Sequence, residues 1–136
     1  MQSPSQFGRA WSIALLALVV LFAVAAILNM MALRVPFLTT HAADLSGPAL
    51  LYIQTRKSWR QGSKRFLTKL IGRSPETAFG VFFLASTATE ISQIFFPHGI
   101  FRGVFDLWDI AAFAAGLVPC YFFDKAGFGL IARPQV

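Results

Sequence analysis

Long apolar runs separated by short polar stretches divide the chain into four expected helices. These helices cover about residues 11–33, 40–56, 77–96 and 105–123. The first run has no charged residue and exceeds the roughly 20 residues that a helix needs to cross a bilayer core. The second is weaker, because it contains Asp44 and Pro48, and it spans only if its ends lie at the interface. The pattern predicts an all-α integral membrane bundle of about four transmembrane helices, forming one domain over residues 1–136.

A cleaved signal peptide is the competing interpretation of the first run. Such a peptide has an apolar region of about 7–15 residues and ends at a small-residue cleavage site. This run is longer, and Asn29, Met30 and Met31 near its end make a poor cleavage site, so we expect a retained helix. The composition agrees with a membrane protein, since only 13% of the residues are charged and 56% are hydrophobic. Soluble domains carry about 25% charged residues.

Basic residues are concentrated at about residues 54–76, between the second and third expected helices. They are Arg56, Lys57, Arg60, Lys64, Arg65, Lys69 and Arg73. Cytoplasmic loops are enriched in Lys and Arg, so this segment and, with four spans, both termini are expected in the cytoplasm. The segment is either a loop or an amphipathic helix on the membrane, and its basic residues are candidates for contact with anionic lipid. Because topology explains the net charge of +6, we expect no nucleic-acid partner.

Four of the six acidic residues are predicted to converge at the opposite, extracytoplasmic end. This polar cluster comprises Asp44, Glu90, Asp106 and Asp109, together with Gln93, His98 and Arg102. Charged groups within membrane segments usually face the bundle interior and have partners. Glu90 and Gln93 share a helix face by their spacing of three residues. The cluster could hold the last two helices together, bind a polar headgroup or small ligand, or carry out catalysis.

Catalysis would require a metal or an acid–base pair. His98 and the acids are suitable ligand types for a divalent ion, but no spacing such as His-Glu-x-x-His is present. We therefore expect neither a metal nor a cofactor. Glu90 or His98 could act as a general base, yet no nucleophile is evident, which favours a binding protein over an enzyme. Ala112 and Gly116 form a small-residue pair that predicts close helix packing.

Residues 89–96, followed by Arg102 and by residues 106–110, resemble the VanZ-like family. That family has a Glu-x-x-Gln helix end, a connector with arginine, and an Asp-x-x-Asp helix start that leads into a helix with glycine, here Gly116. It often has Asn a few residues after the second Asp, where this chain has Ala112 and Phe113. The start of the second expected helix, residues 41–45, is similar to that of related four-span proteins.

The resemblance covers about residues 40–125 and implies a small protein of the bacterial inner membrane. The founding member is associated with resistance to teicoplanin, which acts outside the cytoplasmic membrane. The leading hypothesis is a VanZ-like protein that binds a lipid or cell-envelope component through the polar cluster. One alternative is an accessory or assembly subunit of a larger membrane complex, which copurification of a partner in mild detergent would support. A third is a metal- or acid–base-dependent enzyme acting on a lipid-linked substrate. Membrane lipids are the expected partners, with other subunits in the first alternative.

Overall fold

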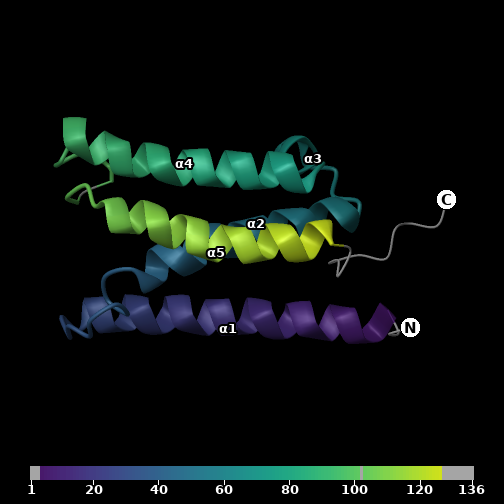
Figure 1. The fold of residues 1–136 in the computed structure, drawn as a ribbon, viewed down its shortest axis with the longest axis horizontal. Coiled ribbons are helices and arrows are strands. Elements are labelled where there is room, and N and C mark those ends of the chain that lie inside the picture. Colours follow the sequence, from purple (N-terminus) through teal and green to yellow (C-terminus); the bar gives the residue numbers. More distant parts are fainter. Residues whose placement is uncertain (1–3, 102, 127–136) are drawn as a thin grey trace.

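The structure is a computed structural model, and it describes residues 4–101 and 103–126. In this part of the chain it is all-helical. The helices are α1 (Pro4–Met30), α2 (Ala42–Arg60), α3 (Phe66–Ile71), α4 (Pro75–Phe95) and α5 (Leu107–Lys125). Four of them are long and lie roughly side by side, while α3 is a short helix at one end (Figure 1). The predicted helix-only fold is confirmed, with boundaries within a few residues of those expected except at the start of α1.

Helix α2 is the centre of the bundle, because it contacts α1, α4 and α5 as well as α3. Among the described residues, α2 is the helix against which α1 packs, and α4 and α5 also pack against each other. In Figure 1, α2 passes behind α5, between α1 and α4. The start of α1, the end of α5 and α3 lie at one end of the molecule, here called the basic end. The starts of α2 and α5 and the end of α4 lie at the other, the acidic end.

One stripe of α2 is buried from end to end. It consists of Ala42, Ser46, Ala49, Ile53 and Arg56, whose spacing of three or four residues places them on one helix face. The hydroxyl of Ser46 donates to the carbonyl of Ala42 at 2.7 Å, so it needs no partner from another helix. The small side chains let neighbouring backbones approach closely. The bundle therefore surrounds the helix that is least apolar.

Within residues 4–101 and 103–126, three helices are long and apolar enough to cross a membrane. These candidate spans are Ser12–Met30, Pro75–Phe95 and Leu107–Lys125. Their outer faces are strongly apolar, and Ile13, Leu16, Leu84 and Phe122 are each more than 60% exposed. Surfaces of this kind are stable in lipid and cause association in water. Helix α2 has 19 residues, or roughly 28 Å, but is too polar to count among the spans by composition.

The basic segment differs in part from the prediction. Residues 54–60 continue α2, and only the short α3 interrupts the connection to α4. Phe66, Leu67 and Leu70 of α3 are more than half exposed, as expected for a helix that lies on a membrane surface. Lys57 lies in α2 and is half-buried, whereas Lys64, Arg65, Lys69 and Arg73 are exposed. The side chain of Arg60 lies outside the described residues.

Arg56 was a candidate for contact with anionic lipid, but its side chain is buried at the basic end. Its Nε donates to Oδ2 of Asp124 at 2.5 Å, and its Nη1 donates to the carbonyl of Gly72 at 2.5 Å. The hydroxyl of Tyr52 donates to the same Asp124 oxygen at 2.8 Å. A buried charge requires such compensation, since desolvation of an unpaired ion costs several kcal/mol. This network joins α2, α5 and the loop before α4.

At Gly116, helices α5 and α2 approach each other closely. A Cβ atom at this position would overlap the backbone carbonyl oxygen of Leu45 and lie 3.5 Å from the Cβ of Ala49. Ala112, one turn earlier, is also buried. Both residues thus lie at a helix contact, where glycine and alanine permit close packing.

Candidate functional site

Three helix ends meet at the acidic end. Asp44 lies in the first turn of α2, Glu90 lies near the end of α4, and Asp109 lies in the first turn of α5. Asp106 caps α5, since its Oδ1 accepts a hydrogen bond from the backbone N–H of Trp108 at 2.9 Å. Acidic residues suit helix N-termini because the helix dipole is positive there. The helix N-termini thus account for three of the acids, Asp44, Asp106 and Asp109, before any function is considered.

The loop that joins α1 to α2 positions His41. Phe37 in this loop has a φ of 68°, in the left-handed region that non-glycine residues rarely adopt. Its carbonyl accepts hydrogen bonds from the backbone N–H groups of His41 and Ala42, at 2.8 and 3.1 Å. The side chain of Asn29 at the end of α1 donates to the carbonyl of Thr39 at 3.1 Å. These bonds fix the imidazole at the start of α2.

His41 reaches across to α5. Its Nδ1 lies 2.7 Å from Oδ1 of Asp109, and both side chains are mostly buried. Asp44, one turn further along α2, lies beside the carboxylate of Asp109. Single ligand atoms of His41, Asp106 and Asp109 all lie within 4.8 Å of one another. The acidic end therefore contains an imidazole and several carboxylates in direct proximity.

Glu90 lies behind this group and is 5% exposed. Its Oε1 accepts a hydrogen bond from Nε2 of Gln93 at 3.2 Å. Its Oε2 is buried and has no hydrogen-bond partner within the described residues. Glu90 also interacts electrostatically with Asp106 and Asp109. The backbone of Gly103 packs on Gln93, where a Cβ atom would lie 2.8 Å from the amide oxygen.

The structure brings most of the sequence-derived polar cluster together. Asp44, Glu90, Gln93, Asp106 and Asp109 meet at the acidic end, whereas His98 is exposed in the loop between α4 and α5. Arg102 lies outside the described residues. Sequence reasoning did not include His41 in the cluster, although its position three residues before Asp44 was a usable signal. From here, the acidic cluster denotes His41, Asp44, Glu90, Asp106 and Asp109.

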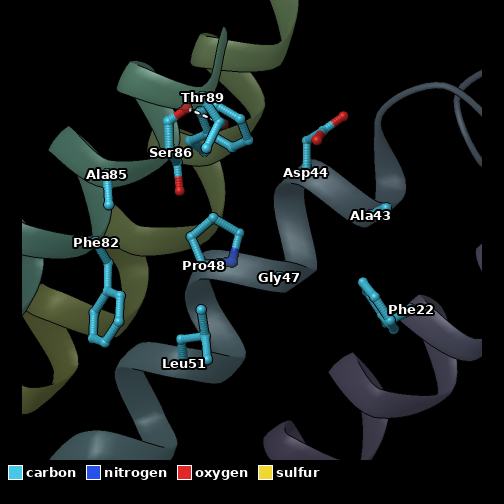
Figure 2. Close-up of a pocket in the computed structure, with 11 residues that line it drawn as sticks. Phe22, Ala43, Asp44, Gly47, Pro48, Leu51, Phe82, Ala85, Ser86 and Thr89 are labelled. Carbon is cyan, nitrogen blue, oxygen red and sulfur yellow. Dashed lines mark hydrogen bonds between the residues drawn. The ribbon is translucent and has the colours of Figure 1, made fainter. Parts of the chain in front are cut away.

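An apolar groove leads away from the acidic cluster. It has a volume of about 370 Å³ and lies over α2, between α1 and α4, which do not contact each other in the described part of the chain. Figure 2 shows Gly47 and Pro48 of α2 between Phe22 of α1 and Phe82 of α4. Asp44 lines the same groove at its polar end. The groove and the acidic cluster therefore share one residue.

No family model, curated protein or solved structure matches the chain. The similarity to the VanZ-like family stays a prediction from the sequence motifs. The geometry of the acidic cluster and of the groove is therefore the basis for a functional proposal.

Proposed function

We propose that the protein is a four-span, VanZ-like protein of the bacterial inner membrane that binds a membrane lipid. The apolar chain of the lipid lies in the groove, and its polar headgroup lies beside the acidic cluster. The observation that carries this proposal is the shared position of Asp44, which lines the groove and lies next to Asp109. A lipid matches the apolar groove and the adjoining acidic cluster, because its apolar tail is joined directly to a polar headgroup.

The walls of the groove support a lipid in preference to a soluble ligand. Phe22 is 43% exposed and Leu51 is 56% exposed, so the groove is open to the outside between apolar side chains. Polar atoms occur at the end near Asp44, where Ser86 and Thr89 of α4 complete the lining. In a bilayer such a groove would admit a lipid laterally, without transfer of its tail through water.

The charge distribution supports an orientation with the basic end in the cytoplasm. Lys64, Arg65, Lys69 and Arg73 are exposed around α3, and such residues are retained on the cytoplasmic side of bacterial membranes. Their proximity to the exposed apolar face of α3 also favours contact with anionic headgroups, at about 1 kcal/mol for each basic residue near the surface. The acidic cluster then faces the outer leaflet.

Blocking the groove is expected to remove the bound lipid. Gly47 lines the groove, and a Cβ atom there would meet nothing within 4 Å, so we expect the side chain of Gly47→Leu to enter and fill the groove. We expect lipid affinity to fall roughly tenfold or more, equivalent to about 1.4 kcal/mol. Native mass spectrometry of the delipidated protein, titrated with lipids from the host membrane, measures this change.

Gly80→Leu is the matched control, because Gly80 also has open space around its Cβ position but does not line the groove. It should bind lipid as the wild type does. Equal lipid binding by Gly47→Leu and the wild type would refute binding in the groove.

Cysteine labelling tests whether α2 crosses the membrane. We expect a membrane-impermeant maleimide to label Leu33→Cys and Ile100→Cys on intact spheroplasts, and Gln61→Cys only after lysis. All three positions are exposed, and Cys120→Ala removes the one native thiol. If α2 does not cross, Leu33→Cys and Gln61→Cys will label from the same side and Ile100→Cys from the other, which contradicts four spans.

A further inference from the structure

We propose that His41, Asp106 and Asp109 form a binding site for a divalent transition-metal ion such as Zn²⁺, with Glu90 as a fourth group behind them. The site uses the residues of the proposed lipid-binding function and deepens it, since the metal would contact the lipid headgroup. This reverses our expectation from the sequence that the protein holds no metal. The histidine considered there, His98, is not part of the site.

The donor set matches the chemistry of such an ion. Zn²⁺ in proteins accepts imidazole nitrogen and carboxylate oxygen at about 2.0–2.2 Å, so two ligands on one tetrahedral ion lie about 3.4 Å apart. The three ligand atoms here lie within 4.8 Å of one another. Modest side-chain rotations would therefore bring them onto one ion. The 2.7 Å contact between His41 and Asp109 would be replaced by a metal bond from each residue.

Glu90 supplies a second and independent observation. Its side chain is 5% exposed, and its Oε2 has no hydrogen-bond partner within the described residues. The amide of Gln93 and the backbone N–H of Asp106 both act on the Glu90 carboxylate, yet in the described part of the chain its Oε2 makes no hydrogen bond of good geometry, and a buried oxygen in this state is costly. Glu90 also interacts electrostatically with Asp109. A cation among these groups would satisfy it. Gln93 orients Glu90 through the hydrogen bond to its other oxygen, as outer-shell partners commonly do at metal sites.

The arrangement of charge also favours a bound cation. Asp44, Glu90 and Asp109 interact with one another at the ends of three helices. Among the ion pairs of the described residues, the only basic group on these carboxylates is His41. Several carboxylates in a desolvated site repel one another unless a proton or cation lies between them. A divalent ion would relieve this repulsion and offer an open coordination position.

The open position explains how an acidic site could bind an envelope lipid. Headgroups that carry phosphate would be repelled by carboxylates alone. A bound divalent ion reverses the local charge and accepts phosphate or hydroxyl oxygen directly. Glu90 lies behind the three ligands and acts on the ion through its charge, so His41, Asp106 and Asp109 leave one coordination position open. Three protein ligands with one open position is also the arrangement of zinc sites that bind an exogenous group.

Zinc titration of the full-length protein tests the proposal. The protein is purified in detergent through a tag without histidine, stripped with a chelator, and titrated with ZnCl₂ in a calorimeter. We expect one Zn²⁺ per chain, confirmed by elemental analysis. His41→Ala and Asp109→Asn should each weaken binding by more than about 100-fold. His98→Ala is the matched control and should bind as the wild type does.

Glu90→Gln keeps the shape of the side chain, so it tests whether a loss of Zn²⁺ binding has a cause other than misfolding. It should weaken Zn²⁺ binding while circular dichroism and gel filtration stay unchanged. Unchanged zinc binding in His41→Ala, or no stoichiometric zinc in the wild type, would overturn the proposal. Zinc binding by Arg102→Ala but not by the wild type would also overturn it, because the guanidinium of Arg102 would then be the natural cation.

Lipid titration of the stripped and zinc-loaded protein separates this inference from the proposed function. If the protein takes up no zinc and still binds lipid, the metal site is overturned and the proposed lipid binding stands. Zinc binding without any lipid binding would support the metal site and refute the proposed function.

Discussion

Asp124→Ala is expected to lower the free energy of unfolding by about 3–5 kcal/mol, as for other buried ion pairs that lose one partner. Arg56 is 2% exposed, and the substitution removes its carboxylate partner. Of the hydrogen bonds of Arg56 described above, the one to the carbonyl of Gly72 remains. The substitution also removes the acceptor of the Tyr52 hydroxyl. Unfolding in detergent, followed by circular dichroism against increasing SDS, measures the change.

Two further variants identify the cause of that loss. Glu76→Ala breaks the ion pair between Glu76 and Lys125, where both side chains are more than half exposed, and exposed pairs contribute little. It should unfold at the wild-type midpoint. Arg56→Met combined with Asp124→Leu removes both charges and should recover most of the stability. A wild-type midpoint for Asp124→Ala would show that the buried network does not stabilise the bundle.

Gly116→Val is expected to destabilise the bundle by roughly 3 kcal/mol, the upper part of the usual range for an overpacked core. The new side chain would overlap the carbonyl oxygen of Leu45, and a helix backbone cannot rotate out of the way as a side chain can. Helices α2 and α5 must therefore separate, which also loosens the acidic cluster that they carry. The same SDS titration measures the effect.

Gly80→Ala separates packing from helix propensity in that experiment. Its Cβ would meet nothing within 4 Å, and alanine is favoured over glycine within a helix by about 1 kcal/mol. We therefore expect a neutral or slightly stabilising effect at Gly80 and a loss at Gly116. If both substitutions have the same effect, close approach at Gly116 does not govern stability.

Much of the fold could be predicted from the sequence, because the runs of apolar residues are long and their ends are marked by polar or turn-forming residues. Asp106 was assigned correctly to the start of the last helix, since a capping residue acts locally. Glu90 and Asp109 were expected to meet because the connector between their helices is short. These features depend on residues that are close in the sequence, and the spacing of residue types predicts such local features well.

The contacts that were missed join residues far apart in the chain. Arg56 was a candidate for contact with anionic lipid because of the charge of its neighbours, but its partner Asp124 lies 68 positions away. His41 reaches Asp109 across the same separation, and the rotation of one helix against another determines which side chains meet. Periodicity indicates a buried face but does not identify what that face will contact. For the same reason, His98 was considered as a ligand in place of His41.

A helix as polar as α2 gains little from lipid by itself, and its stability in a membrane depends on the helices that surround it. Helix α5 covers the Gly116 contact and supplies the partner of Arg56, yet a ribosome completes α2 well before it makes α5. During synthesis, α2 would remain at the membrane surface or beside the insertion machinery until its covering helix emerged. Truncation before α5 is therefore expected to yield a chain that membrane proteases remove, since its central helix would lack the shielding on which it depends.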